Sequence, residues 1–210
     1  VMIINLHAIK PTYMSESEIS SSDIYLQNEI VFEKGKKYLL KANSGHGKSS
    51  ILNFIYGSNK NYNGKIIFEG VEDYSVIFLR RTKLAYVFQD FKLFSNLTLW
   101  ENIKIKNNLT KYKTDEQILI LIEKLGLLHK KNQLVETLSL GQKQRVSIIR
   151  SLCQPFDFLL LDEPFSHLDE DNIRILTNII NEELENQNSG LILTTLNNEY
   201  LFKYDKILNL

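Results

Sequence analysis

Residues 41–50 read KANSGHGKSS and stand between two apolar segments, residues 38–40 and residues 51–55. The residues before this stretch are typical of a strand, and those after it have the spacing of a helix. Glycine and serine are frequent in ordinary turns, so a simple turn is one interpretation. The other is a loop that wraps phosphate, which requires this order of strand, loop and helix.

The phosphate-binding pattern is a glycine, four residues and then Gly-Lys-[Ser/Thr]. Gly47-Lys48-Ser49 matches the end of the pattern, whereas Ala42 stands where the first glycine belongs. Glycines let consecutive backbone N–H groups curl around phosphate oxygens without a Cβ in the way, and the following helix adds its positive end. Gly45 and Gly47 still provide most of this freedom. We therefore expect Lys48 to contact the β- and γ-phosphates and Ser49 to hold Mg²⁺.

Two acidic residues, Asp162 and Glu163, follow the apolar run Phe158–Leu161. A continuous apolar run of this length is typical of a strand that is buried on both faces of a parallel sheet. The two acids could be a solvated strand end. Alternatively, Asp162 can hold Mg²⁺ through water while Glu163 orients and deprotonates an attacking water.

The order of the apolar patterns predicts an α/β fold, and no linker composition divides residues 1–210 into independent domains. A turn at residues 61–64 is expected before the fourth strand. Strands are expected at Met2–Ile9, Tyr25–Phe32, Tyr38–Ala42, Lys65–Phe68, Phe158–Leu161, Leu191–Leu193 and Lys206–Leu210. Helices are expected from Lys48 to a stop at Gly57, from Thr114 to a stop at Gly126, and at Gly141–Cys153 and Glu170–Glu185.

Composition bounds the function without deciding it. Lys and Arg number 25 and Asp and Glu number 25, so no net charge favours nucleic acid or an anionic membrane surface, and we expect no nucleic-acid partner. The single cysteine, Cys153, fits a reducing compartment and is interpreted as a small buried apolar residue rather than a nucleophile. No run of eighteen apolar residues occurs, so we expect a cytoplasmic chain that does not itself cross a membrane.

The segment LSLGQ, residues 138–142, lies upstream of LLLDEP and resembles the signature motif of the ATP-binding cassette (ABC) ATPases. The family pattern is LSGGQ, so Leu140 replaces one glycine. Gln89 in YVFQDFKLF resembles the Q-loop of the family, and SHLD at residues 166–169 resembles its D-loop. Tyr13 stands where the family usually has an aromatic residue that stacks on adenine. The resemblance covers essentially the whole chain. Within the family, the motifs of this chain are similar to those of the branch that serves lipoprotein release, macrolide efflux and cell division.

The resemblance implies the P-loop NTPase fold of an ABC ATPase: a mixed sheet core with an antiparallel β subdomain and a helical subdomain inserted at about residues 91–153. It implies ATP and Mg²⁺ as cofactors and a head-to-tail homodimer, in which each ATP lies between one subunit's phosphate loop and the other's signature helix. The catalytic residues would be Glu163, Lys48 and Gln89, and the metal ligands Ser49, Gln89 and Asp162. The ATP contacts would be Tyr13, Asn43, Ser44, Gly45, His46, Gly47, Lys48, Ser49, Ser50, Gln89, Ser139, Leu140, Gly141, Gln142 and Asp169.

One feature of the family is missing. Its members usually carry a histidine after the strand that corresponds to Leu191–Leu193, where the imidazole contacts the γ-phosphate. Here either Thr195 or Leu196 occupies that place. Because removal of one transition-state donor slows turnover by roughly one to three orders of magnitude, we expect slow hydrolysis.

The segment after Gln89 is rich in apolar side chains, namely Phe91, Leu93, Phe94, Leu97, Leu99 and Trp100. These side chains could form a small satellite core. Equally, they could form a surface that docks a short helix of a membrane subunit. The resemblance implies such permease subunits, encoded separately, which would hold the chain at the inner face of the cell membrane. Two other functions stay open: a soluble ABC ATPase outside transport, and an ATP-dependent dimerisation switch that hardly hydrolyses.

Overall fold

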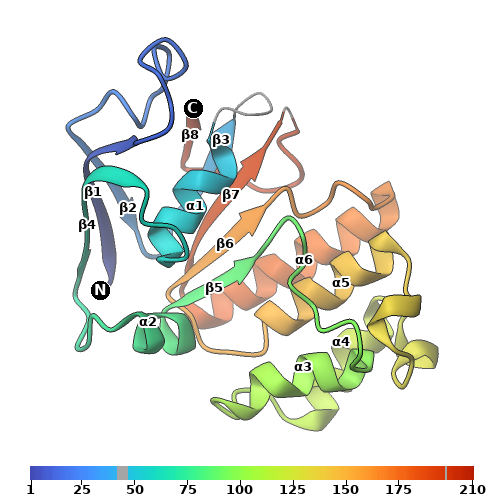
Figure 1. Ribbon diagram of the computed structural model, residues 1–210. Coiled ribbons are helices and arrows are strands. Elements are labelled where there is room, and N and C mark those ends of the chain that lie inside the picture. The colour runs from blue at the N-terminus through green and yellow to red at the C-terminus, as the bar shows by residue number, and fades with distance from the viewer. Residues whose placement is uncertain (42–46, 197) are drawn as a thin grey trace.

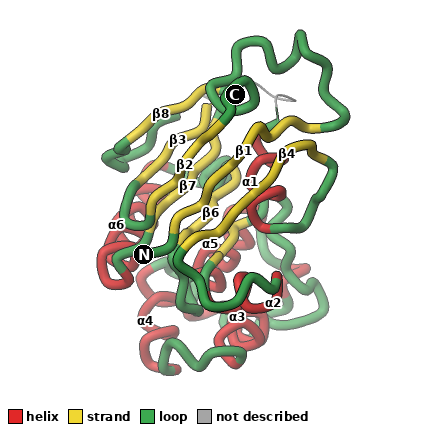
Figure 2. Tube along the Cα trace, turned by 90° about the vertical axis from the view of Figure 1, so that its left-hand side faces the viewer, coloured by secondary structure: helices red, strands yellow, loops and turns green. Residues whose placement is uncertain are grey.

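The computed structural model describes residues 1–41, 47–196 and 198–210, and two sheets organise them (Figures 1 and 2). An antiparallel sheet has the strand order β2-β1-β4, and a parallel sheet has the order β5-β6-β7-β3-β8. The first sheet consists of β1 (Ile3–Pro11), β2 (Glu29–Glu33) and β4 (Tyr62–Glu69). The second consists of β3 (Lys37–Lys41), β5 (Leu84–Val87), β6 (Phe158–Asp162), β7 (Gly190–Thr195) and β8 (Lys206–Asn209).

Helices cover both faces of the parallel sheet, as Figure 1 shows. Helix α1 lies between this sheet and the antiparallel one, whereas α5 and α6 pack on the opposite face, and α3 and α4 lie beyond α5 at one end of the molecule. The helices are α1 (Lys48–Tyr56), α2 (Val76–Thr82), α3 (Leu99–Asn108), α4 (Asp115–Lys124), α5 (Leu140–Ser151) and α6 (Glu170–Gln187), with short 3₁₀ turns at Leu128–Lys130 and Val135–Thr137.

Two apolar cores follow from the alternation of side chains along each strand of the parallel sheet. Leu159 and Leu161 of β6 point to the core shared with α5 and α6, whereas Leu160 points to the core shared with α1 and the antiparallel sheet. All three are fully buried. A strand that is apolar at every position is therefore explained by helices on both faces, and the predicted α/β class is confirmed.

Two predicted boundaries were wrong. The expected strand Tyr25–Phe32 is a strand only from Glu29, because the backbone N–H of Tyr25 donates to Ser22 Oγ at 2.9 Å and holds residues before Glu29 in turns. The expected turn at residues 61–64 lies largely inside β4, whose residues Tyr62 and Asn63 pair with the end of β1 beyond an irregularity in the register. Gly57, in contrast, ends α1 with φ of 74°, as predicted.

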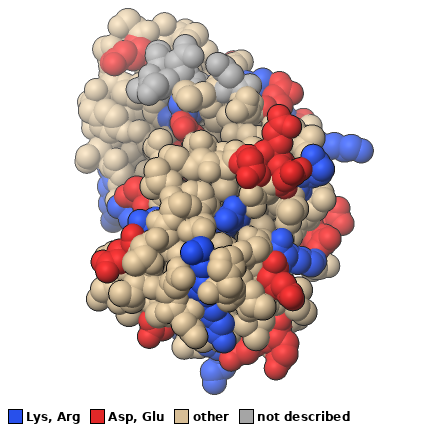
Figure 3. All heavy atoms as spheres, turned by 90° about the vertical axis from the view of Figure 1, so that its right-hand side faces the viewer, with Lys and Arg blue, Asp and Glu red and all other residues tan. Residues whose placement is uncertain are grey.

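Charge is intermixed on the face that Figure 3 shows, where basic and acidic side chains alternate with uncharged ones. Within the described residues, no helix combines the length and the apolar character that crossing a membrane requires.

Candidate nucleotide site

The predicted site lies where parallel strands end. Because β3, β6 and β7 are neighbours and parallel, the residues that follow their carboxyl ends meet at one edge of the sheet. Ligands of open α/β sheets bind at this kind of edge. Of the predicted contacts in the phosphate loop, Asn43, Ser44, Gly45 and His46 lie outside the described residues, as does Ala42.

The described part of the phosphate loop begins at Gly47, the residue before α1. Gly47 has φ of 82°, a left-handed conformation that favours glycine, and the Tyr25 hydroxyl donates to its carbonyl at 2.9 Å. A Cβ added at Gly47 would lie 2.8 Å from that hydroxyl oxygen. Glycine is thus required here both by the backbone and by the packing of Tyr25, and the positive N-terminal end of α1 begins directly after it.

Lys48 and Glu163 form an ion pair, with Nζ and Oε1 3.3 Å apart. The Lys48 side chain is 6% exposed and that of Glu163 is 17% exposed. Both are therefore largely shielded from solvent, and dissolved salt weakens their attraction little. Glu163 has φ of 46°, a sparsely populated conformation for a non-glycine residue that recurs at functional sites, and its N–H donates to the Thr194 carbonyl at 3.1 Å. The predicted catalytic carboxylate and the predicted phosphate-binding lysine are therefore in contact.

Asp162, the last residue of β6, is almost fully buried. Thr194 Oγ1 donates to its carboxylate at 2.7 Å, and the Tyr86 hydroxyl approaches it at 3.5 Å. Burial raises the pKa of Asp162 above its usual range, and hydrogen bonds from Ser49 and Thr194 oppose that shift. A buried carboxylate is a group that a bound cation would stabilise.

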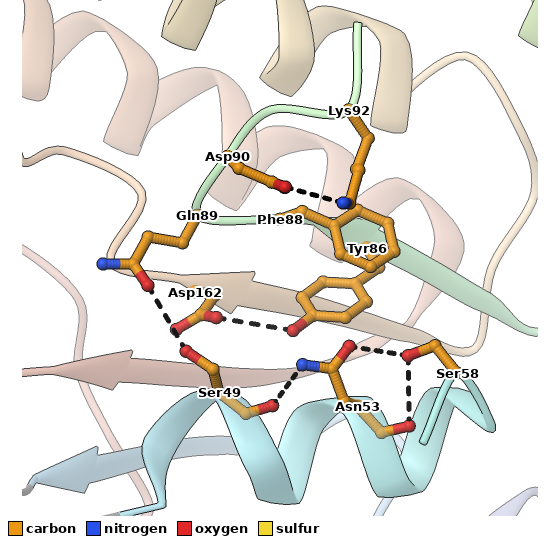
Figure 4. A pocket seen from close by; sticks show the side chains of 9 residues that line it. All are labelled: Ser49, Asn53, Ser58, Tyr86, Phe88, Gln89, Asp90, Lys92 and Asp162. Carbon is orange, nitrogen blue, oxygen red and sulfur yellow. Dashed lines mark hydrogen bonds and ion pairs between the residues drawn. The ribbon is translucent and has the colours of Figure 1, made fainter. Parts of the chain in front are cut away.

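Figure 4 shows the cavity into which Asp162 faces. Ser49 Oγ donates to Gln89 Oε1 across 3.5 Å, so that the three predicted metal ligands, Ser49, Gln89 and Asp162, present oxygen atoms to one space. Oxygen is the donor that Mg²⁺ prefers, so these residues fit that ion. The cavity has a volume of about 470 Å³ and is lined by Ser49, Asn53, Ser58, Tyr86, Phe88, Gln89, Asp90, Lys92 and Asp162.

The predicted signature segment starts α5 with a capping box. Gln142 N donates to Ser139 Oγ at 3.3 Å, and Ser139 N donates to Gln142 Oε1 at 2.9 Å. Leu140 is exposed, and Gly141 lies so close to the segment at residues 166–169 that a Cβ would be 2.7 Å from the His167 carbonyl oxygen. Glycine at position 141 is thus required by close backbone approach.

Gln144, one turn into α5, connects three segments of the predicted site. Its side-chain amide donates to the Glu163 carbonyl at 3.2 Å and to Ser166 Oγ at 3.3 Å, and its oxygen accepts from His167 N at 3.0 Å. Gln89 also borders a second cavity, of about 430 Å³, together with Leu140 and His167. The start of α5 is therefore fixed relative to Glu163, although the hydrogen bonds of Ser139 and Gln142 stay within their own capping box.

The remaining predicted ATP contacts lie at the rim. Tyr13 is 54% exposed and its hydroxyl donates to Ser50 Oγ, so its ring is available at the start of α1. Asp169 caps α6, and a hydrogen bond from Asn172 N at 2.8 Å keeps the pKa of its carboxyl below the usual range. The nucleotide roles of these residues stay predictions.

Four residues of the site were missed in the sequence: Thr194, Tyr86, Asn53 and Gln144. Asn53 Nδ2 donates to the Ser49 carbonyl at 2.6 Å from the next turn of α1, a spacing that the sequence does display. Thr194 could be found only by knowing that β6 and β7 pair with Asp162 opposite Thr194. Tyr86 stands three residues before Gln89, in a strand of four residues that the sequence analysis left unassigned.

The apolar segment after Gln89 mostly joins the main core that α5 and α6 share, rather than forming the separate satellite core that was one of the two expectations. Leu99 is fully buried, and Leu93 and Trp100 pack against the core that α5 and α6 share. Phe94 differs, since it is 51% exposed. Cys153 is buried and burial raises the pKa of its thiol to about 12, which agrees with the prediction of an unreactive core residue.

The parallel sheet, the phosphate loop and the paired acids define the class of P-loop nucleotide-binding proteins. A sequence model described as ABC transporter matches residues 27–166, and the chain belongs to this family. The chain is 30% identical over 198 residues to the lipoprotein-releasing system ATP-binding protein LolD of Buchnera aphidicola, covering 90% of this chain and 85% of that one. It is also 30% identical over 178 residues to the cell division ATP-binding protein FtsE of Bacillus subtilis, covering 81% of this chain and 77% of that one. The predicted resemblance is thus confirmed.

Solved structures agree. A dimeric ATP-binding cassette in a post-hydrolysis state, bound to ADP and Pi, superimposes with a TM-score of 0.75 and 25% identity, covering 92% of this chain and 88% of that one. A dimeric bacterial ABC transporter cassette superimposes with a TM-score of 0.75 and 26% identity over the same shares. The predicted fold, that of an ABC ATPase, is therefore confirmed.

Proposed function

We propose that this chain is the ATP-hydrolysing subunit of a transporter, and that two copies close around ATP to move separately encoded membrane subunits. The observation that carries the proposal is the 3.3 Å ion pair between Lys48 and Glu163, next to the buried Asp162. A cation for phosphate, a carboxylate for water and a second carboxylate for a metal ion lie together at the carboxyl edge of one sheet.

The residues of this chain would share the work as follows. The Lys48 ammonium leaves Glu163 for the more highly charged phosphates, and the freed Glu163 carboxylate accepts a proton from the attacking water. Ser49, Gln89 and Asp162 would hold Mg²⁺, which when bound neutralises charge on the phosphate oxygens. Tyr13 would stack on adenine.

The proposed dimer rests on a second anion-binding site, at the start of α5. The N-terminus of α5 carries unpaired N–H groups and the positive end of a helix, and the hydrogen bonds of Ser139 and Gln142 keep within the capping box there. Delivery of a phosphate to this end by a second copy would complete each site. The dimeric state of the similar cassettes supports this arrangement.

Hydrolysis is proposed to be slow. Thr195 is buried at the end of β7, whereas Leu196 is 44% exposed directly after it. An exposed leucine offers no donor to a γ-phosphate, and loss of one donor costs roughly one to three orders of magnitude in turnover. The same observation favours a second candidate function, an ATP-dependent dimerisation switch with little turnover.

The proposed partners are integral membrane subunits, and the proposed location is the inner face of the cell membrane. The family match and the names of the relatives, a lipoprotein-releasing system and a cell division protein, support both. Substrate and direction of transport belong to those subunits.

The decisive experiment measures ATP binding by calorimetry and phosphate release on four proteins. Lys48→Ala should lose binding, while its control Lys36→Ala, whose lysine pairs with Glu33 at the surface, should bind as the parent does. Glu163→Gln should bind ATP, elute as a dimer in ATP and release phosphate at least 100-fold more slowly than the parent. Equal phosphate release by Glu163→Gln and the parent supports the switch instead, and a parent that does not bind ATP contradicts both functions.

A further inference from the structure

Tyr25 contacts the phosphate loop from the segment that connects β1 to β2, drawn in blue in Figure 1. The side chain is 1% exposed, and its hydroxyl donates to the Gly47 carbonyl oxygen at 2.9 Å. Burial, together with the nearby Tyr13, raises the pKa of Tyr25 well above its usual range. The hydroxyl therefore keeps its proton across the working pH range, and Tyr25 is a permanent donor to the residue that precedes α1.

Hydrogen bonds fix the backbone around Tyr25. Ser22 Oγ accepts from the N–H groups of Ile24 at 3.1 Å and of Tyr25 at 2.9 Å, and all three residues of this turn are buried. Asp23 connects the same turn to the end of β8, because its N–H donates to the Asn209 carbonyl at 2.7 Å and its carboxylate accepts from Asn209 N at 2.7 Å. The Tyr25 ring thus stands on a firmly held turn.

The hydrogen bond from Tyr25 determines where the next N–H group points. The peptide bond between Gly47 and Lys48 is trans, so the Gly47 carbonyl and the Lys48 N–H point in opposite directions. The carbonyl also accepts from Ile51 N at 3.1 Å, the first hydrogen bond of α1. Because two donors hold the carbonyl on the helix side, the Lys48 N–H points out of the helix end, toward the position where anions bind at helix N-termini.

A glycine at position 47 gives this support a purpose. Gly47 has φ of 82° and no Cβ, and glycine adopts several backbone orientations at little cost. A Cβ added there would lie 2.8 Å from the Tyr25 hydroxyl oxygen and 3.3 Å from Met14 Sδ, so the segment between β1 and β2 approaches it closely. The same segment carries Tyr13, whose hydroxyl donates to Ser50 Oγ. It therefore contacts the start of α1 at two places, Gly47 and Ser50.

We propose that Tyr25 is a positioning residue for the phosphates of the nucleotide: its hydroxyl holds the Gly47 carbonyl so that the Lys48 N–H faces a phosphate oxygen. This inference rests on the proposed function, because it requires that the chain binds ATP. Since Tyr25 is buried, it acts through the peptide group of Gly47 and Lys48. Removal of the hydroxyl alone leaves the Ile51 hydrogen bond in place, so that α1 still forms while the direction of the Lys48 N–H is less strictly fixed.

The first test compares Tyr25→Phe with the control Tyr38→Phe. Tyr38 is also buried, at 3% exposure, and its hydroxyl accepts from Glu33 N at 2.9 Å, at the start of β3. Each variant loses one hydrogen bond of a buried tyrosine, and urea unfolding measures what that loss costs in stability. Calorimetry with ATP and with inorganic tripolyphosphate should show about fivefold or more weaker binding of both ligands to Tyr25→Phe, and parent-like binding to Tyr38→Phe. Parent-like binding of tripolyphosphate by Tyr25→Phe, or equal losses in the two variants, overturns the proposal.

A second measurement keeps the hydroxyl in place and does not depend on the folding of a variant that lacks it. 3-Fluorotyrosine is introduced at position 25 alone, and its fluorine NMR signal is followed while tripolyphosphate is added. Because the hydroxyl contacts the peptide group that receives the phosphate, the signal should shift saturably, with the dissociation constant that calorimetry gives. The same label at position 38 should not shift. A label at position 25 that stays unchanged while tripolyphosphate binds overturns the proposal.

ATP binding by the parent chain separates this inference from the proposed function. Lys48→Ala removes a predicted phosphate contact, whereas Tyr25→Phe removes only the support of the loop. Loss of ATP binding in Lys48→Ala together with parent-like binding in Tyr25→Phe leaves the proposed function standing and removes the role of Tyr25. A parent chain that ignores ATP removes the proposed function, and this inference with it.

Discussion

Asp162 is predicted to lower the stability of the protein when no ligand is bound. The ionised carboxylate is 2% exposed, and removal of a carboxylate from water costs several kcal/mol. The Thr194 hydrogen bond, at 2.7 Å, offsets part of this cost, since a hydrogen bond to a charged group returns about 1.5–3 kcal/mol. Asp162→Asn keeps the shape and an acceptor for Thr194 but removes the charge. We expect the variant to be more stable by about 2 kcal/mol, or roughly 4–8 °C in Tm for a chain of this size.

The pH dependence of the folding stability provides an independent test of the same prediction. Because burial raises the pKa of Asp162 in the folded state, the folded chain holds a proton that the unfolded chain has released, and stability falls as pH rises from the ordinary aspartate pKa through the raised one. Asp162→Asn should lack this fall. The assay is urea unfolding of metal-free, nucleotide-free protein over a pH series. A variant that is less stable than the parent at neutral pH, or an unchanged pH profile, refutes the reasoning.

Three further predictions test other parts of the molecule. Gly141→Ala should lower the free energy of unfolding in urea by about 1–3 kcal/mol, because the new Cβ would meet the His167 carbonyl oxygen at 2.7 Å; a loss below about 0.5 kcal/mol contradicts the close approach. Leu196→His should raise kcat at least tenfold with an unchanged Tm, since the position is exposed and the imidazole supplies the missing donor; an unchanged kcat would show that this position does not face the γ-phosphate. At pH 8 only about one Cys153 thiol in ten thousand is ionised for a pKa of about 12, so native protein should react with Ellman's reagent at least 100-fold more slowly than protein in urea; comparable rates would place the thiol at the surface.

Local patterns in the sequence predicted the elements that carry their own signals. The continuous apolar run of β6, the glycine that ends α1 and the acids that follow β6 are each readable within a few residues. The capping box of α3, in which Thr98 and Glu101 exchange hydrogen bonds, is a local signal of the same kind.

Contacts between strands and helices far apart in the chain could not be read in this way. Thr194 reaches Asp162 only because β6 and β7 are paired in one particular register, and Gln144 reaches Glu163 only because α5 packs beneath the loop after β6. Partners of this kind depend on tertiary packing, which one sequence does not specify position by position.

The Lys48–Glu163 ion pair implies a reason for the proposed enzyme to rest without nucleotide. While no phosphate is present, the ammonium of Lys48 holds the carboxylate of Glu163, with Nζ and Oε1 3.3 Å apart. A carboxylate oxygen that contacts the ammonium is directed toward Lys48 rather than toward an attacking water. Triphosphate carries more negative charge than one carboxylate and competes for the same lysine. In the proposed mechanism Glu163 therefore becomes a free base only when ATP has arrived, so that the arrangement of these two side chains would couple ATP binding to the capacity for hydrolysis.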